Sequence, residues 1–281
     1  MTFPIVTIAI LAKQKEPVLP LYLQCIENLD YPKSNIFLYI RTNDNSDNTE
    51  QILSEFIYRV GYKYKSVFFN SSSCDPELKN IAVHDWSSLR RFKIISKIRQ
   101  DSIDYAINNN SDFYFTADCD NWILPHTLKR LLEWNVSCVG PFLTVNESNT
   151  LYSNYHDKVT YDGWFDDSNV YDFIYSRQVK GLIEVDCIHC TYLIRSDVLP
   201  FVKYENEEYA QLGNNFEYAA FSKSLRDNGF PQYLDNREIY GKLTLIEEVG
   251  TMEEWLKDNI KWQISFFVWL WKMKLMLLKD V

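Results

Sequence analysis

Short apolar runs that alternate with longer amphipathic stretches constrain the fold of this chain more than any other feature. Residues 5–11, 36–40 and 113–117 are apolar runs, and apolar residues recur at helical spacing in 19–26, 49–59 and 90–109. Apolar runs of this length suit strands that are buried on both faces, and strands that alternate with helices form parallel sheets. The sequence therefore predicts an α/β protein whose mostly parallel, Rossmann-like central sheet is flanked by helices.

The rest of the chain predicts further strands and helices around this sheet. We expect strands at 65–69 and 185–195 and helices at 125–133 and 216–227. The length of 281 residues allows one large domain or two small ones. We expect a single domain over residues 1–250, followed by an amphipathic helix within 251–281.

The predicted C-terminal helix is apolar on nearly all its faces. Lysines interrupt its apolar part, so it is too short to cross a bilayer, which takes roughly 18 apolar residues. Docking on its own domain or homodimerisation would cover such a helix. Peripheral contact with a membrane interface is the alternative, because Lys and Trp are favoured there.

The charge balance excludes one class of partner. The chain has 29 Lys and Arg against 38 Asp and Glu, a net charge of -9. Broad binding to a phosphate backbone needs clustered positive charge, so nucleic acid is not an expected partner. With 46% hydrophobic residues, the chain has enough apolar content for a folded core.

Two carboxylates follow the predicted strand 113–117. Asp118 and Asp120 are separated by one residue, and alternate residues of an extended chain project to the same side. Two carboxylates at this spacing can share a Mg²⁺ or Mn²⁺ ion, and such ions neutralise phosphates. The alternative is that the pair only ends a strand and caps a helix.

Two earlier loops lie at the same predicted edge of the sheet. Ligands of open α/β sheets bind at the carboxyl ends of the strands, so the loops that start at Ala12 and Thr42 are expected to hold a nucleoside. Asn43 or Asp44 would bond the base or the ribose, although Asn and Asp also build ordinary turns. His189, on a later strand, is a candidate third metal ligand or a buried core histidine.

Several segments together resemble the glycosyltransferase domain of the procollagen galactosyltransferases. The resemblance covers roughly residues 3 to 245 and is carried, in order, by residues 43–49, Asp85-Trp86-Ser87, Arg91-Phe92, 97–100, 112–121, 152–154, 189–194 and 238–241. It implies a GT-A fold, a UDP-sugar donor, and Mn²⁺ (or Mg²⁺) on Asp118 and Asp120. Asp118 would then contact both the metal and the donor.

The resemblance also implies an activity. It implies transfer of a hexose, galactose in preference to glucose, to a hydroxyl of a protein or glycan acceptor such as hydroxylysine in a collagen-like chain. Arg91, Lys97 and Arg99 match the family and would face the diphosphate, because charge-assisted contacts to phosphate are strong. Solvated positions on a helix are the alternative for all three.

The resemblance implies that transfer inverts the anomeric centre of the sugar. An inverting transfer needs a general base near the acceptor hydroxyl. Glu217 is the expected base, because similar transferases place an acidic residue about twelve positions before a glycine such as Gly229. Asp186 is the second candidate. Where the family has adjacent aspartates, this chain has Asn214 and Asn215, whose amides do not accept a proton at neutral pH.

That departure keeps a second function open. A catalytically silent GT-A domain would bind a sugar nucleotide or glycan as a scaffold. A nucleotidyltransferase would also use paired carboxylates, but 12–17 lack the glycine-rich loop it needs. The animal enzymes enter the secretory pathway, whereas this sequence shows no export signal or retention ending, so a cytoplasmic enzyme of viral or microbial type is expected.

Overall fold

The protein is described here by a computed structural model, which defines residues 3–77, 85, 87–145 and 152–243. The part of the chain up to Leu243 forms one compact unit. The predicted helix within 251–281 lies outside the described residues, so its docking or dimerisation stays a prediction. No helix in the described part of the chain is long and apolar enough to span a membrane.

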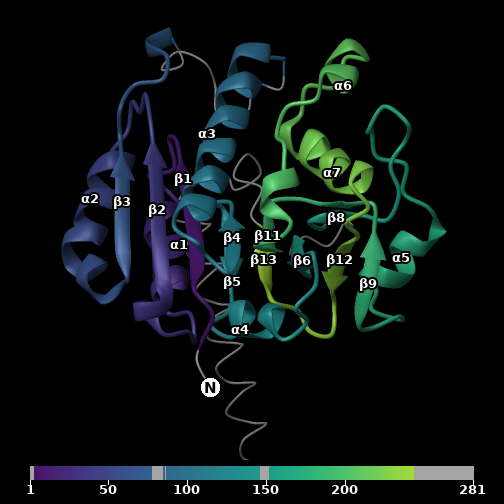
Figure 1. Cartoon of the computed structure of the whole chain (residues 1–281), viewed down its shortest axis with the longest axis horizontal. Coiled ribbons are helices and arrows are strands. Elements are labelled where there is room, and N and C mark those ends of the chain that lie inside the picture. Colours follow the sequence, from purple (N-terminus) through teal and green to yellow (C-terminus); the bar gives the residue numbers. More distant parts are fainter. Residues whose placement is uncertain (1–2, 78–84, 86, 146–151, 244–281) are drawn as a thin grey trace, which may run out of the picture. The chain divides into compact units, whose positions relative to one another are not determined.

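An eight-stranded sheet forms the centre of this unit (Figure 1). Its strands, in spatial order, are β3 (Ser66–Asn70), β2 (Ile36–Thr42), β1 (Val6–Ala12), β4 (Phe113–Ala117), β11 (Thr191–Arg195), β6 (Cys138–Pro141), β12 (Gln232–Asp235) and β9 (Leu182–Val185). The first four are mutually parallel, which places their carboxyl ends at one edge. β11 runs antiparallel between β4 and β6. The predicted α/β sheet is confirmed.

Helices cover both faces of this sheet because its strands are apolar on both faces. They are α1 (Leu19–Glu27), α2 (Thr49–Val60), α3 (Leu89–Asn108), α4 (Thr127–Leu132), α5 (Asn169–Tyr175), α6 (Glu207–Gln211) and α7 (Glu217–Asp227), with 3-10 turns η1 (Lys33–Asn35), η2 (Gly61–Lys63) and η4 (Leu199–Phe201). The side chain of Ser88 caps α3 by accepting from the N–H of Arg91. Figure 1 shows α3 beside α7, and these two helices position the site described below.

Two small sheets complete the unit. One pairs β5 (Asn121–Ile123), β13 (Gly241–Leu243) and β7 (Leu143–Val145), and the other pairs β10 (Cys187–Ile188) with β8 (Tyr155–His156). A Cβ on Gly241 would lie 1.7 Å from the carbonyl oxygen of Trp122, so only glycine fits there. This glycine lets β13 pair with β5, the strand that directly follows the carboxylate pair.

The strand predicted for 185–195 is divided into separate pieces. β9 ends at Val185, β10 is a two-residue strand in the second small sheet, and only β11 continues in the central sheet. Cys190, which precedes β11, has a φ of 62°. A left-handed residue cannot continue a strand, so the apolar pattern alone overestimated its length.

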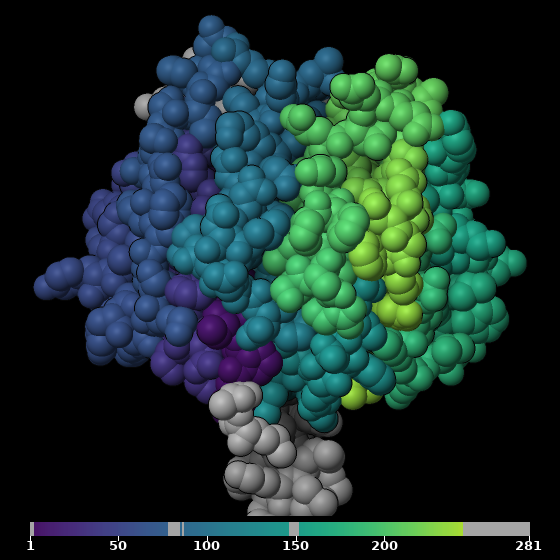
Figure 2. Space-filling model, viewed as in Figure 1, coloured from purple at the N-terminus to yellow at the C-terminus, as the bar shows by residue number. Residues whose placement is uncertain are grey.

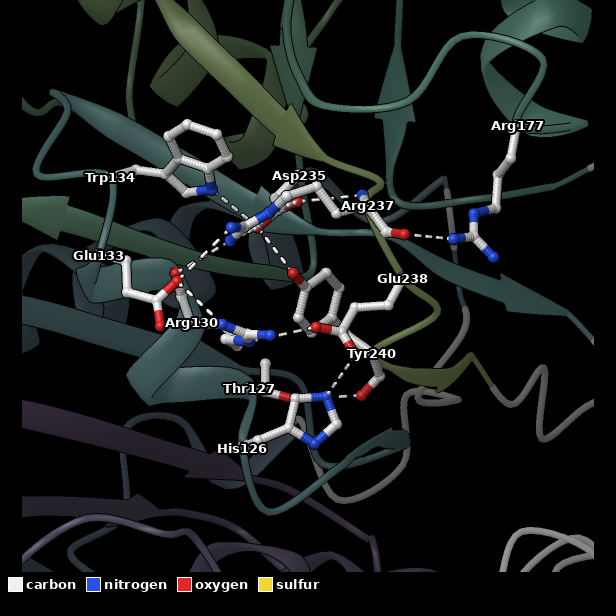
Figure 3. A network of polar contacts seen from close by, with 10 residues as sticks. All are labelled: His126, Thr127, Arg130, Glu133, Trp134, Arg177, Asp235, Arg237, Glu238 and Tyr240. Carbon is white, nitrogen blue, oxygen red and sulfur yellow. Dashed lines mark hydrogen bonds and ion pairs between the residues drawn. The ribbon is translucent and has the colours of Figure 1, made fainter. Parts of the chain in front are cut away.

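A polar network around the buried Asp235 ties β12 to α4 (Figure 3). Asp235 is fully buried and accepts from Trp134 Nε1 at 2.8 Å, Tyr240 Oη at 2.7 Å and Arg237 Nη2 at 2.7 Å. The Arg237 guanidinium also lies 4.3 Å from the centre of the Trp134 ring. Burial by itself would raise the pKa of Asp235, but the hydrogen bonds from Arg237, Trp134 and Tyr240 lower it.

We expect Asp235→Asn to lower the free energy of unfolding at pH 7 by about 2 kcal/mol, because hydrogen bonds to a charged group contribute roughly 1.5–3 kcal/mol. The folded pKa is lowered, so the carboxylate stabilises the fold above its unfolded pKa of about 3.9 and this contribution is lost at lower pH. Urea unfolding of both proteins should therefore show a gap that narrows below about pH 4. Asp197→Asn, at an exposed pair with Arg195, is the control. An equal gap at pH 7 and pH 3 would contradict this role for Asp235.

Candidate active site

The turn after β4 holds the carboxylate pair at the carboxyl edge of the sheet. The N–H of Asp118 donates to the carbonyl of Cys190 at 2.9 Å, and Asn121 Nδ2 donates to Thr191 Oγ1 at 2.8 Å. These bonds attach the turn to the start of β11. The side chains of Asp118 and Asp120 are 29% and 20% exposed, so both carboxylates are partly open to solvent.

Each carboxylate has its own cation from a different part of the chain. Arg99 Nη2 donates to Asp118 Oδ1 at 2.8 Å, and Lys15 Nζ donates to Asp120 Oδ2 at 2.5 Å. Burial by itself would lower the pKa of Lys15 and that of Arg99. Asp120 raises the pKa of Lys15 and Asp118 raises the pKa of Arg99, so both pKa values lie above their ordinary values. Both cations are therefore held charged beside the carboxylate pair.

Arg99 also reaches a third carboxylate. Its Nε lies 3.5 Å from Oε1 of Glu217, which is buried in the first turn of α7. The Arg99 side chain is 9% exposed, and among the described residues its buried Nε and Nη1 have no hydrogen-bond partner, so its contact with Glu217 is an ion pair. One guanidinium on α3 thus connects the turn after β4 to the start of α7.

His189 lies in the connection just before β11, one residue from the carbonyl that Asp118 contacts. Its Nδ1 is 2.9 Å from Cys190 Sγ, and its ring is 5.3 Å from that of His156. Burial, with smaller effects of His156 and Arg99, lowers the pKa of His189 well below its ordinary value. The ring is therefore neutral at neutral pH, and its buried Nε2 has no hydrogen-bond partner in the structure.

The loops after β1 and β2 contact one another, as their common edge predicts. The N–H of Gln14 donates to Asn45 Oδ1 at 2.9 Å, and Asn45 Nδ2 donates to Thr42 Oγ1 at 2.6 Å. Ala12 ends β1 and is buried. These loops bring Ala12 and Thr42 to one edge, where their contact with a nucleotide stays a prediction.

Asp44 has the turn-building role that the sequence offered as the alternative to a ligand contact. Its carboxylate accepts from the N–H groups of Cys74 and Asp75 and from Ser73 and Asn43. Burial alone would raise the pKa of Asp44, but these hydrogen bonds lower it to about 2. Asn43 is likewise buried against Asp44, so both side chains stabilise the turn.

The remaining predicted residues are placed as follows. Arg91 is partly buried, and burial lowers its pKa while Glu217 and Asp118 nearby favour its charge. Lys97 is 72% exposed and pairs with Asp101 on the same helix, so the structure does not bring it together with Arg99. Asp186 lies between β9 and β10, where its Oδ2 accepts from the N–H of Val159 at 3.1 Å.

The residues fit a divalent cation that arrives with a diphosphate. Two carboxylates with partly open oxygens lie on one turn, and Mg²⁺ is usually held by one or two carboxylates together with substrate phosphates. In the part of the chain that the structure describes, no group of three or more His, Cys, Asp or Glu is placed to hold a metal ion by itself. Asp118 and Asp120 fit such an ion as two of its ligands.

The sheet order and the site together define a class of protein. The chain has the GT-A glycosyltransferase fold, and TarS of S. aureus has a similar structure, with a TM-score of 0.53 at 14% identity over 86% of this chain and 37% of that one. A crystal structure of TarS residues 1–349 in complex with UDP-GlcNAc matches with a TM-score of 0.52 at 14% identity, over 85% of this chain and 58% of that one. The expected GT-A fold is confirmed.

The chain belongs to glycosyltransferase family 25, whose N-terminal domain profile matches residues 3–262. It is 32% identical to human procollagen galactosyltransferase 2 over 94% of this chain and 42% of that protein. It is 30% identical to procollagen galactosyltransferase 1-A of Xenopus laevis, over 89% of this chain and 41% of that protein. An inactive glycosyltransferase 25 family member 3 of the mouse is 32% identical over 92% and 44%. The chain spans about two fifths of the length of these relatives.

These relatives correct one expectation. The prediction of a cytoplasmic enzyme is wrong. It contrasted this chain with the animal enzymes of the secretory pathway, and the similar proteins are animal procollagen galactosyltransferases. The prediction rested on the two ends of the sequence. A chain that spans 42% of a relative carries no such information at its ends.

Proposed function

We propose that this chain is a metal-dependent glycosyltransferase that moves a hexose, preferably galactose, from a UDP-sugar to an acceptor hydroxyl. The observation that carries the proposal is the Arg99 bridge, with Asp118 at 2.8 Å on one side and Glu217 at 3.5 Å on the other. Transfer needs a group that holds the donor diphosphate and a base for the acceptor. Arg99 connects Asp118, the candidate for the first role, with Glu217, the candidate for the second.

The residues take the following roles in this proposal. Asp118 and Asp120 hold a divalent ion, Mn²⁺ or Mg²⁺, which when bound neutralises the charge that develops on the leaving diphosphate. His189 stays the third candidate ligand, because the Nε2 of its neutral ring has no hydrogen-bond partner among the described residues. It does not form a ready three-ligand group with the two carboxylates, so it would join the ion only after a side chain moves. Arg99 orients Asp118 and Glu217, and Glu217 accepts the proton of the acceptor hydroxyl.

A pocket beside this site suits the acceptor. It has a volume of about 270 Å³, lies where α3 meets α6 and α7 (Figure 2), and its lining includes Phe92, Phe216, Asn215 and the acidic pair Glu205 and Glu207. Lys93 also lines the pocket, so its charged residues are two carboxylates and one lysine. Aromatic rings and a net negative charge together fit an aliphatic side chain with an amino group. We propose hydroxylysine of a collagen-like protein as the acceptor, with a glycan hydroxyl as the alternative.

A silent sugar-nucleotide-binding domain is the second candidate, and one observation favours it. Asn214 occupies a position where the resemblance implies an aspartate, and here it is structural, since its Oδ1 accepts from the N–H of Phe216 at 3.2 Å and its Nδ2 donates to the carbonyl of Asp162 at 2.9 Å. A residue with both groups so used has no part in proton transfer. Some relatives are also named inactive.

A donor hydrolysis assay separates the two functions. UDP-galactose and UDP-glucose are incubated with the protein and Mn²⁺, with and without a chelator, and released UDP is measured. Metal-dependent release supports the transferase. Tight UDP binding without release of UDP from either sugar nucleotide, also in the presence of a hydroxylysine peptide, would identify the scaffold.

A further inference from the structure

The charged residues of the site form the pairs Lys15–Asp120, Arg99–Asp118 and Arg99–Glu217. Of these residues, Lys15 is the one that the sequence analysis did not predict. It lies in the loop after β1, and both its backbone N–H and its backbone carbonyl form hydrogen bonds. Its N–H donates to Thr49 Oγ1 at 2.7 Å, and its carbonyl accepts from the N–H of Leu19 at 2.9 Å, in the first turn of α1. Because the backbone is held between α1 and α2, only the side chain of Lys15 is free to change its contacts.

The ammonium of Lys15 forms an ion pair with the carboxylate of Asp120, which the proposed function assigns to the metal. Nζ lies 2.5 Å from Asp120 Oδ2, and the two side chains are only 12% and 20% exposed. A lysine ammonium so far removed from water needs a negative partner. A divalent cation at Asp120 would compete with this ammonium for the same oxygen and be repelled by its charge.

A diphosphate removes this conflict. It brings negative oxygens to the same edge of the sheet, and the lysine ammonium is a common phosphate ligand that acts as a point charge. The four-carbon stem of lysine is flexible, so its charge can move while the backbone stays in place. Arg99, by contrast, is held by two carboxylates on different elements.

We propose that Lys15 is a counter-ion that neutralises Asp120 when no metal is bound and transfers to the diphosphate when the metal and the nucleotide bind. The proposal rests on the proposed function, because it takes Asp120 as a metal ligand. It means that Mn²⁺ alone binds weakly, that UDP strengthens Mn²⁺ binding, and that Mn²⁺ strengthens UDP binding by the same factor. Lys15 thus makes the metal and the nucleotide bind as a pair.

The test compares Mn²⁺ binding by wild type and Lys15→Met. Free Mn²⁺ is measured by electron paramagnetic resonance without nucleotide and with saturating UDP, and UDP binding is measured by calorimetry with and without Mn²⁺. In Lys15→Met we expect Mn²⁺ alone to bind about tenfold tighter and the strengthening by UDP to fall by about tenfold, within the usual range of such couplings. UDP without metal should bind more weakly than to wild type.

Three further variants complete the design. Lys129→Met removes an exposed pair with Asp30 and should behave as wild type. Lys15→Arg keeps the charge and should keep weak binding of Mn²⁺ alone, so tight binding by this variant would overturn the proposal. Lys15→Gln lacks the charge but can still donate to Asp120, and it replaces Lys15→Met if thermal melting shows that the latter is unfolded.

The arms separate the two ideas. A wild type that binds Mn²⁺ neither alone nor with UDP would overturn the metal-dependent function itself. A wild type that binds Mn²⁺ with UDP, together with a folded Lys15→Met that shows the same two affinities, would overturn only the role of Lys15.

Discussion

Asp118→Asn is expected to reduce sugar transfer from a UDP-sugar by about a thousandfold. The amide keeps the size of the side chain and an oxygen for Arg99, but it removes the negative charge that would hold a divalent ion at the diphosphate. Such an ion contributes several kcal/mol to the stability of the transition state, and each 1.36 kcal/mol is a factor of ten in rate. The turnover number with saturating Mn²⁺ and donor is the measurement.

Asp101→Asn is the matched control, because Asp101 pairs with Lys97 on the exposed face of the helix that carries Arg99. We expect full activity from it. Thermal melting of both variants separates a lost metal ligand from a lost fold. If Asp118→Asn is folded and turns over at the wild-type rate with Mn²⁺, the carboxylate pair is not the donor site.

The parallel half of the sheet could be predicted from the sequence because its strands are buried on both faces. The strand Phe113–Ala117 was predicted at its observed bounds, and the strand that starts at Ile36 extends two residues further than predicted, to Thr42. The later strands could not be predicted so well. β12 consists of Gln232–Asp235, and its polar ends interrupt the apolar pattern because Asp235 belongs to the network of Figure 3.

The site was predictable where it depends on position along a strand and unpredictable where it depends on distant pairs. Asp118 and Asp120 lie at the carboxyl end of β4, as expected from their place in the sequence. Asp120 pairs with Lys15, which is 105 residues away, and no local pattern marks such a pair. For Asp44 the sequence left a ligand contact and a turn equally open, and the bonds that decide for the turn come from Cys74 and Asp75, 30 and 31 residues away. Its contact with a nucleotide stays a prediction.

Glu217→Gln is expected to lower the turnover number for transfer to a hydroxylysine peptide by about 10²- to 10⁴-fold, the usual contribution of a general base. Glutamine has the same length and keeps an oxygen facing the Arg99 guanidinium, which stays paired with Asp118 at 2.8 Å, so the binding of UDP and Mn²⁺ should stay close to wild type. A loss of turnover with unchanged donor binding is the signature of a base.

Two comparisons make this test decisive. Glu55→Gln, on the exposed face of α2 beside Gln51, should have wild-type activity. Asp186→Asn examines the second candidate base. A folded Glu217→Gln with full turnover, together with a large loss in Asp186→Asn, would move the base to the end of β9. If neither variant loses transfer, the acceptor proton leaves by another route, and the Arg99–Glu217 pair then serves to anchor α7 against α3 beside the donor carboxylates.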